Sequence, residues 1–238
     1  MPVGKLIVIE GGDGSGKATQ TRMLMNYLKK KGIPARTISF PRYTGSFYGK
    51  IVGRLLSGEF GEFNTISPYL AALPYAFDRF KARETLTSWL ARGNTVVLDR
   101  YVTSSMAHQA AKLPEKDRPS FIKWIEEMEY SVNKLPRPDI VLYLHVPWKI
   151  TESLTKKAIG SGDIAEQDHD HRRIVEQMYV ELSRKNRTWK VVECVDEGGK
   201  LLEESEIHNR VVKRLSFSSV QRCTLLLRCF PPETLLRR

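Results

Sequence analysis

Five short apolar runs are spaced along the chain, and helical periodicity fills much of the sequence between them. In the segment 17–31, Met23, Leu24, Tyr27 and Leu28 recur at the spacing that places side chains on one helical face. Nearly continuous apolar strands that alternate with helices are typical of a parallel sheet buried on both faces, because parallel strands need crossover connections. The pattern predicts an α/β fold with a doubly wound, five-stranded parallel sheet flanked by helices. The predicted strands are 5–10, 35–40, 95–99, 140–146 and 189–194.

The same patterns set the predicted domain organisation. Helices are predicted at 46–56 and 68–91, and the glycine-bearing stretch 158–164 (AIGSGDI) predicts a mobile loop. A length of 238 residues is enough for one sizeable core and demands no second domain, so one domain is predicted over residues 1–215. Residues 216–238 form a tail of different composition, with four arginines against one glutamate, for which neither structure nor function is predicted.

Composition places the chain among soluble globular proteins. Hydrophobic residues make up 41% and charged residues 27%, and no apolar run approaches the roughly 20 residues that cross a bilayer. The first apolar run lacks the length and the cleavage site of a signal peptide. The three cysteines are far apart, without a C-x-x-C pair, which fits neither a disulfide framework nor a zinc site. These observations predict a cytoplasmic protein that does not bind membranes.

Positive charge is the main departure from an average composition. The net charge is +11, yet the basic residues are scattered through helical segments rather than gathered into one stripe with aromatic residues between them. Binding to nucleic acid is therefore not predicted. A site for two phosphorylated ligands needs several cations, and the remaining lysines and arginines are interpreted as an ordinary solvated surface.

The strongest functional signal is the segment 11–18 (GGDGSGKA), which matches the phosphate-binding loop G-x-x-x-x-G-K except at its last position. It follows a predicted strand and opens a predicted helix, so backbone N–H groups can point at a β-phosphate while Lys17 reaches the γ-phosphate. A plain glycine turn is the alternative, but spacing and context together favour a P-loop NTPase-like site. The residues predicted to bind ATP are Gly11, Gly12, Asp13, Gly14, Ser15, Gly16, Lys17, Ala18 and Thr19.

The departure from the loop pattern is Ala18, where a serine or threonine hydroxyl usually binds Mg²⁺. Thr19 projects about 100° further round the helix and is no obvious substitute. Mg²⁺ keeps much of its hydration, so the ATP phosphates, water molecules and Asp99 can hold it together. Mg²⁺ is therefore predicted as the cofactor that accompanies ATP, with Asp99 as a metal ligand through water.

Charged residues follow two further predicted strands, at the edge of the sheet where ligands bind in such folds. Asp99 and Arg100 end the third strand, and Arg42 follows Pro41 just after the second. Arg100 offers planar donors to a phosphate or to the charge that develops during transfer, and Arg42 can grip an acceptor phosphate. The alternatives are an ion pair that only caps the third strand and, for Arg42, an ordinary exposed loop arginine.

The motif YAFDR lies on a predicted helix. It places Tyr75 and Arg79 four residues apart and therefore on the same face. The two side chains are interpreted either as a wall of a base pocket or as ordinary packing, and the motif alone does not decide between them. Phe77 and Phe80 are expected in the core.

Four motifs together resemble those of the thymidylate kinase family: EG-x-DG-x-GK, FPR, aromatic-x-x-x-R and DRY-x-x-SS-x-A-x-Q. They stand here at 10–17, 40–42, 75–79 and 99–109 (DRYVTSSMAHQ), and the likeness extends to about residue 215. The resemblance implies that ATP and thymidine monophosphate (dTMP) are the substrates, and that long helices form a homodimer. The residues implied to bind dTMP are Asp13, Arg42, Tyr75, Arg79, Arg100, Ser104, Ser105 and Gln109.

The resemblance also gives these residues roles. Arg42 and Arg100 hold the acceptor phosphate, and Asp13 holds the deoxyribose 3′-hydroxyl. Tyr75 stacks on thymine, and Arg79 reaches a thymine carbonyl. The residues implied to line the pyrimidine side are Ser104, Ser105 and Gln109, and the segments apolar enough for a dimer interface are 69–80 and 121–130.

The chain departs from the family in its supply of a catalytic arginine, which the family places inside the P-loop or in a lid. Gly14 occupies the P-loop position, and the lid, predicted at about 151–171, contains two lysines but no arginine. Arg172 and Arg173 at its far end are the nearest. A lysine offers the charge without the planar fork of arginine, so the group that clamps the γ-phosphate is left open.

The predicted function is the ATP-dependent phosphorylation of dTMP to dTDP, a step of dTTP biosynthesis, by direct in-line transfer. Two alternatives stay open: a kinase for another deoxynucleotide or nucleoside, and a catalytically weak nucleotide-binding protein. The predicted catalytic residues are Lys17, Arg100, Asp13 and Asp99.

Overall fold

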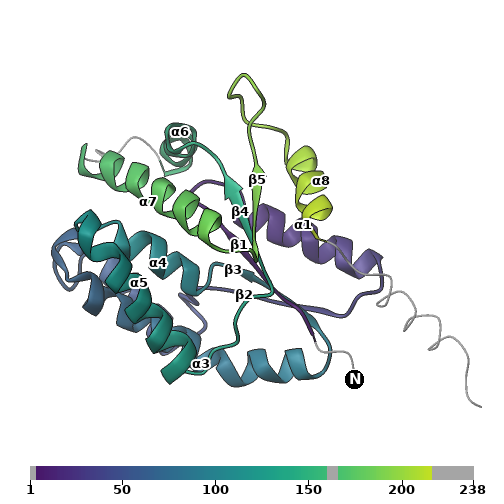
Figure 1. Ribbon diagram of the computed structural model, residues 1–238, viewed down its shortest axis with the longest axis horizontal. Helices are drawn as coiled ribbons and strands as arrows, with labels where there is room; N and C mark the ends of the chain where they lie inside the picture. Colours follow the sequence, from purple (N-terminus) through teal and green to yellow (C-terminus); the bar gives the residue numbers. More distant parts are fainter. Residues whose placement is uncertain (1–3, 160–165, 216–238) are drawn as a thin grey trace, which may run out of the picture.

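A five-stranded parallel sheet forms the centre of the protein (Figure 1). The computed structural model describes residues 4–159 and 166–215, and the strands lie in the order β2-β3-β1-β4-β5. All neighbouring strands in this sheet run parallel, so the chain crosses over between them. The prediction of a doubly wound α/β fold is confirmed. The strands are β1 (Leu6–Glu10), β2 (Ala35–Ser39), β3 (Thr95–Asp99), β4 (Ile140–His145) and β5 (Trp189–Glu193).

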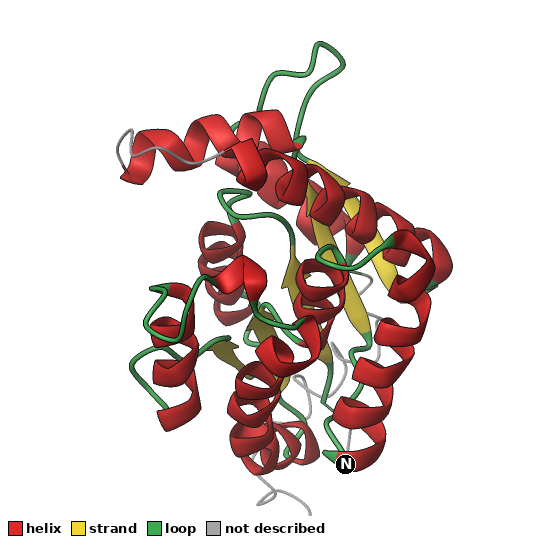
Figure 2. Cartoon of the chain, turned by 90° about the vertical axis from the view of Figure 1, so that its left-hand side faces the viewer, coloured by secondary structure: helices red, strands yellow, loops and turns green. Residues whose placement is uncertain are grey.

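Helices cover both faces of the sheet (Figure 2). They are α1 (Lys17–Lys30), α2 (Phe47–Leu56), α3 (Pro68–Ala91), α4 (Val102–Ala110), α5 (Arg118–Glu126), α6 (Trp148–Ile159), α7 (Glu166–Lys185) and α8 (Glu204–Arg214). The short turns are η1 (Phe63–Thr65), η2 (Glu115–Asp117) and the π-helical turn η3 (Glu127–Val132). α1 and α8 pack on one face of the sheet, and α3, α4 and α7 pack on the other, where α5 lies against α4.

Two apolar clusters build the core, one on each face of the sheet. Side chains of a strand alternate between faces, so Leu6 of β1 joins the cluster under α3, α4 and α7. Ile7 and Ile9 join the cluster that contains Leu24 and Leu28 of α1. All residues of β1 are buried, which explains why this strand is a continuous apolar run in the sequence.

The carboxyl ends of β1, β2 and β3 meet at one edge of the sheet. The backbone N–H of Arg100, just after β3, donates to the Ile9 carbonyl of β1 at 3.1 Å. The N–H of Phe40, just after β2, donates to the Asp99 carbonyl at 2.9 Å. The three segments that carry the sequence motifs therefore converge in space, as the fold class predicts.

The expectation that Phe77 and Phe80 lie in the core is wrong. Phe77 is 45% exposed and Phe80 is 36% exposed. The inward face of α3 is formed largely by smaller side chains, such as Ala76 and Ala82. Because α3 carries apolar residues around much of its circumference, helical spacing alone does not identify its buried face.

The predicted lid, residues 151–171, spans most of α6 and the start of α7. Ala158 and Ile159, predicted to begin a mobile loop, still belong to α6. The rest of that predicted loop and the tail 216–238 lie outside the described residues.

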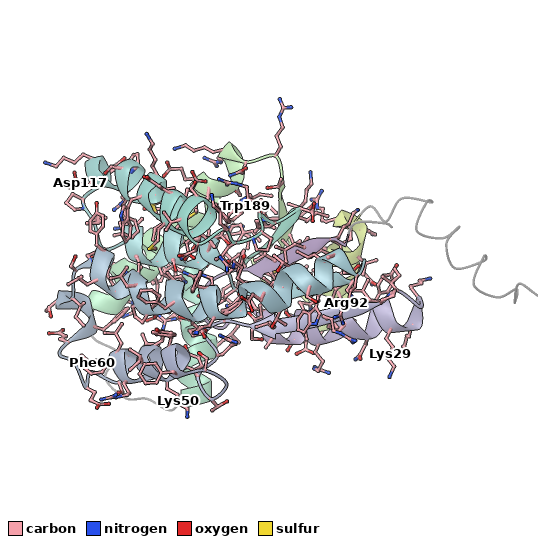
Figure 3. All side chains as sticks on the ribbon, turned by 90° about the horizontal axis from the view of Figure 1, so that it is seen from below. Lys29, Lys50, Phe60, Arg92, Asp117 and Trp189 are labelled. Carbon is pink, nitrogen blue, oxygen red and sulfur yellow. The ribbon has the colours of Figure 1, made fainter. Side chains whose placement is uncertain are left out.

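Cationic side chains are distributed over the surface. In Figure 3, the labelled Lys29 and Arg92 lie at one end of the molecule, and Lys50 lies near Phe60 towards the other. In the part of the chain that the structure describes, no helix has the length and apolar character needed to cross a membrane.

Candidate active site

The segment between β1 and α1 is a tight, glycine-rich loop. Gly14 and Gly16 have φ angles of 82° and 83°, in the left-handed region that favours glycine, and Gly16 is the N-cap of α1. A Cβ atom on Gly11 would lie 2.5 Å from the Ser15 Oγ atom, which leaves room only for glycine. The loop presents backbone N–H groups at the N-terminus of α1, the arrangement that binds phosphate in such loops.

Lys17 lies at the first position of α1 and is only 7% exposed. Its Nζ atom donates to the Gly12 carbonyl at 2.6 Å, so the ammonium group folds back over the loop. Burial and the nearby Arg100 guanidinium lower the pKa of Lys17 to about 8. A poorly solvated cation at a helix N-terminus is well placed to bind a phosphate.

The predicted role of Lys17 in binding ATP, together with its lowered pKa, predicts a pH dependence of ATP use. As the pH rises through about 8, the ammonium loses its proton and its attraction for the triphosphate, so kcat/KM for ATP should fall by up to tenfold per pH unit. Bound phosphate favours the ammonium, so kcat at saturating ATP should fall only at higher pH. Steady-state rates between about pH 7 and pH 9.5 measure both profiles. A kcat/KM for ATP that is flat over this range would contradict the prediction.

Arg100 lies directly after β3, with a backbone φ angle of 65° that is uncommon for a residue with a side chain. Its Nη2 atom pairs with the Asp13 carboxylate, and its Nη1 atom lies 3.4 Å from the Gly11 carbonyl. Burial raises the pKa of Asp13, but Arg100 and other nearby cations hold that pKa below its usual range. Such backbone conformations cluster at functional sites, where surrounding contacts maintain them.

His108 of α4 supports Arg100 from a second side. Burial and the charge of Arg100 lower the pKa of His108 to about 3, so the imidazole is neutral. Its Nε2 atom lies 3.3 Å from Arg100 Nη1 and accepts the hydrogen bond. The His171 ring on α7 lies 6.2 Å from the His108 ring, centroid to centroid. α4 and α7 thus both approach Arg100.

A cavity of about 330 Å³, within the size range of small-molecule sites, opens between the P-loop, α3, α4 and α7. The lining contributed by the P-loop, β3, α4 and α7 includes Gly12, Asp13, Arg100, His108, His171 and Arg172. The lining contributed by α3 and α4 includes Tyr75, Arg79, Ser104, Ser105 and Gln109.

The α3 and α4 side of the cavity carries buried polar groups. Arg79 is 2% exposed, and its Nη2 atom donates to Ser105 Oγ at 2.8 Å. Gln109 is 3% exposed, and its Oε1 atom has no hydrogen-bond partner among the described residues. Tyr75 lines the cavity together with Arg79, which favours the pocket interpretation of the YAFDR motif over ordinary packing. We call this side the inner end of the cavity because Arg79 and Gln109 are almost fully buried. It offers a donor, an acceptor and an aromatic ring.

Comparison with known proteins identifies the family. The family model for thymidylate kinase matches residues 9–204. The probable thymidylate kinase of Thermococcus onnurineus is 31% identical over 224 residues, which cover 91% of this chain and 99% of that protein. The chain belongs to the thymidylate kinase family. The resemblance drawn from the four motifs is thereby confirmed.

Two further thymidylate kinases set the extent of the similarity. The enzyme of Mycobacterium tuberculosis is 38% identical over 142 residues, which cover 59% of this chain and 65% of that protein. The structure of thymidylate kinase from Candida albicans superposes with a TM-score of 0.68 at 25% identity, and covers 89% of this chain and 91% of that one. The P-loop kinase fold is thus common to both structures.

Glu10, the last residue of β1, links the elements around this site through hydrogen bonds. Its buried carboxylate accepts hydrogen bonds from the Tyr101 N–H and the Thr103 hydroxyl at Oε1. At Oε2 it accepts from Ser104 Oγ at 2.6 Å and from the Tyr179 hydroxyl of α7 at 2.9 Å. One carboxylate therefore connects the P-loop strand to α4 and α7.

Ser104, which the resemblance places on the pyrimidine side, lies between Glu10 and Arg100. Its Oγ atom donates to Glu10 and accepts from Arg100 Nη1 at 3.2 Å. It also lines the cavity. Contact between Ser104 and a pyrimidine stays a prediction.

Arg42 lies at the predicted edge of the sheet, where its guanidinium is bound to Asp78 of α3. Nε donates to Asp78 Oδ1 at 3.0 Å and Nη2 donates to the Asp78 carbonyl at 2.7 Å. Pro41 and Tyr43 line the cavity, but Arg42 is not among its lining residues in the described part of the chain. The grip of Arg42 on an acceptor phosphate stays a prediction.

The residues around Asp99 fit a magnesium ion whose ligands are mainly nucleotide phosphates and water. Burial raises the pKa of Asp99, and the nearby Lys17 and Arg100 oppose this rise. Across residues 4–159 and 166–215, no group of three His, Cys, Asp or Glu side chains is arranged to hold a metal ion. Ser15 Oγ is a buried oxygen without a hydrogen-bond partner in the same part of the chain. This donor set suits Mg²⁺ bound chiefly through nucleotide phosphates and water.

Like Glu10, other polar side chains that sequence analysis did not assign hold or face those that it did. Four of these are Asp78, His108, Glu129 and His171. Two of them stand inside the motifs YAFDR and DRYVTSSMAHQ, so those motifs contained a signal that was not used. The other two come from η3 and α7, where no motif marks them, and only folding brings them to the site.

Proposed function

We propose that the protein transfers the γ-phosphoryl group of ATP to dTMP, forming ADP and dTDP, the step that supplies dTTP synthesis. The observation that carries the proposal is one cavity of about 330 Å³ lined by the P-loop and Arg100 as well as by Arg79 and Gln109. A nucleoside monophosphate has the matching order of groups: phosphate, sugar and base. The names of the related proteins, all thymidylate kinases, support dTMP as the acceptor.

Donors and acceptors at the inner end of the cavity match thymine. Thymine presents a carbonyl acceptor at C4 and an N–H donor at N3, whereas cytosine presents a donor at C4 and an acceptor at N3. Arg79 can only donate, and the Oε1 atom of Gln109 is an acceptor without a partner among the described residues. Thymine satisfies both groups, whereas cytosine would turn an amino group towards a guanidinium. Tyr75 supplies the ring on which the base stacks.

Cations meet where the phosphoryl group would transfer. Lys17 and the loop amides are proposed to hold the ATP phosphates, and Arg100 to support the acceptor phosphate. Arg42 is bound to Asp78 and lies outside the cavity lining, so its contact with the acceptor phosphate stays a prediction. Direct in-line transfer needs fixed reactants and stabilised charge but no covalent enzyme intermediate. Asp13 orients Arg100 through their ion pair. We propose, from the family resemblance, that it also accepts a hydrogen bond from the sugar hydroxyl.

Mg²⁺ is the proposed cofactor, bound through the ATP phosphates and water, with Asp99 reached through a water molecule. When bound, it neutralises part of the phosphate charge. Because Ala18 supplies no hydroxyl, most of the affinity for the metal comes from the nucleotide.

Arg172 is proposed to supply the arginine that the P-loop and the predicted lid lack. It lies in the first turns of α7, lines the cavity beside His171, and its charge lowers the pKa of Asp13. A guanidinium at this position can stabilise the charge of the transferring group with two parallel donors, which a lysine cannot do.

A coupled assay of ADP release with dTMP, dUMP, dCMP, dGMP or thymidine as acceptor tests the proposed function. We expect the highest kcat/KM for dTMP, about 100-fold or more above dCMP, because cytosine mismatches both Arg79 and Gln109. dUMP lacks only a methyl group and should fall about tenfold below dTMP. Equal turnover of dTMP and dCMP would contradict the acceptor assignment. Tight ATP binding in calorimetry, without phosphorylation of any acceptor, would instead favour a nucleotide-binding protein.

We also infer a homodimer, formed through α2 and α3. These helices expose large apolar side chains, including Phe47 at 71%, Leu70 at 63% and Phe77 at 45%. The rings of Phe47 and Phe77 both contact that of Tyr48, and exposed apolar side chains that gather in this way are typical of an interface. The other predicted interface segment, 121–130, contributes less because Phe121 is fully buried in the core. A cytoplasmic location is part of the same proposal.

A further inference from the structure

Arg79, the proposed donor to the base, is held by a buried carboxylate, that of Glu129. The two residues are 2% and 0% exposed. Nε of Arg79 donates to Glu129 Oε1 at 2.9 Å, and Nη2 donates to the same oxygen and to Ser105 Oγ. Bonds from two nitrogens to a carboxylate, and from one of them to a hydroxyl, fix both the position and the plane of the guanidinium.

These contacts occupy Nε and Nη2 of Arg79 and leave Nη1 with only a weak contact. Nη1 of Arg79 lies 3.4 Å from the Tyr101 carbonyl, near the outer limit of a hydrogen bond. Arg79 itself lines the cavity, and the fully buried Glu129 stands behind it. Nη1 is therefore the nitrogen with donor capacity for a ligand.

Glu129 lies in an irregular helical turn, which positions its carboxylate beside Arg79. α5 passes into the π-helical turn η3, where the Asn133 N–H donates to the Met128 carbonyl, five residues earlier, at 2.9 Å. Glu129 lies within this turn, whose wider winding changes the direction of its side chain relative to a continued α-helix. π-helical turns are rare and are found frequently at functional sites.

Glu129 also balances the charge of Arg79. A buried guanidinium without a counter-charge would favour an anion at the inner end of the cavity, because an unpaired buried charge is costly. The Arg79–Glu129 pair is neutral as a whole and suits an uncharged carbonyl ligand. The phosphate of an acceptor is attracted instead to the end near Lys17 and Arg100.

We propose that Glu129 is a positioning residue for acceptor specificity. It holds Arg79 so that Nη1 meets the C4 carbonyl of thymine, and it makes the inner end of the cavity selective for a neutral pyrimidine over an anion. The inference rests on the proposed function, and Glu129 acts through Arg79 without touching the substrate.

The variant Glu129→Gln keeps the shape of the side chain and removes its charge. We expect the KM for dTMP to rise about tenfold, kcat to stay within about twofold, and the preference for dTMP over dCMP to fall about tenfold. Competitive inhibition by inorganic phosphate against dTMP should strengthen by about threefold or more, because the inner end then carries a net positive charge. If Glu129 had a purely structural role, Glu129→Gln would have lower thermal stability but the same inhibition constant for phosphate as the wild type.

Two further variants separate charge from geometry. Glu129→Asp keeps the charge but withdraws the carboxylate by one methylene group, so the KM for dTMP should rise while phosphate inhibition stays at the wild-type value. Glu126→Gln removes a 41% exposed carboxylate from the same helical segment. It should leave the KM for dTMP, kcat, the preference for dTMP over dCMP and the phosphate inhibition unchanged. If Glu129→Gln does not fold, Glu129→Asp carries the test. A folded Glu129→Asp with wild-type KM and wild-type discrimination against dCMP would overturn the proposal.

The wild-type assay distinguishes failure of this inference from failure of the proposed function. A wild-type chain that does not prefer dTMP over dCMP shows that the proposed function is wrong, whatever the variants do. A wild-type chain that prefers dTMP, together with an unchanged Glu129→Gln variant, overturns the role of Glu129 alone.

Discussion

Replacing Lys17 with methionine is expected to lower kcat for dTMP phosphorylation by about 10³-fold or more. Methionine fills similar space at this position, where the residue is 7% exposed, but it removes the charge that we propose meets the γ-phosphate. Single-turnover measurements with saturating ATP and dTMP report the loss directly, because they separate chemistry from binding.

Lys29→Met is the matched control, since Lys29 is an exposed lysine in the last turn of the same helix. Its turnover should equal that of the wild type. Thermal melting of both variants shows whether the fold is retained. A folded Lys17→Met variant with turnover within tenfold of the wild type would exclude the proposed role of the P-loop lysine.

Arg172→Ala should lower kcat by about 10² to 10³-fold, while the KM for dTMP changes by only a few-fold. The expected pattern follows from a guanidinium that meets the transferring group more strongly in the transition state than in the ground state. Arg172→Lys should recover part of the rate, because it restores the charge without the planar fork. Steady-state kinetics of the two variants measures both effects.

Arg173→Ala controls for the loss of a neighbouring positive charge. Arg173 is 46% exposed and pairs with Asp170 at 3.1 Å, so its removal should leave kcat near the wild-type value. Equal losses in the two alanine variants would indicate a general effect of charge on α7. No loss in either would mean that another group stabilises the transferring phosphoryl.

Strand positions could be predicted to within one residue, most clearly for β1, β3 and β4, because burial on both faces makes these three strands read as apolar runs. β1 is the clearest example, since all its residues are buried. Face assignment on α3 failed because small residues, rather than Phe77 and Phe80, occupy the buried side. Periodicity shows that a helix is present, but a helix that is apolar on several sides does not reveal which side is covered.

The P-loop and Arg100 could be found from sequence because parallel strands bring their carboxyl ends to one edge and a motif marks each end. The carboxylates that hold the site arginines could not be found in this way. Asp78 is 36 residues from Arg42, and Glu129 is 50 residues from Arg79. Neither separation belongs to a periodic pattern, so only tertiary packing brings each carboxylate to its guanidinium.

The hydrogen bonds of Glu10 have a mechanical consequence. One carboxylate accepts hydrogen bonds from the Tyr101 backbone, the Thr103 hydroxyl and the Tyr179 phenol, so the P-loop strand and the walls of the cavity are held by a common anchor. If ATP and the acceptor bind as proposed, the fold itself sets the distance between the two nucleotides. We then expect less orientational freedom to be lost when the substrates bind, which would lower the entropic part of the barrier to transfer.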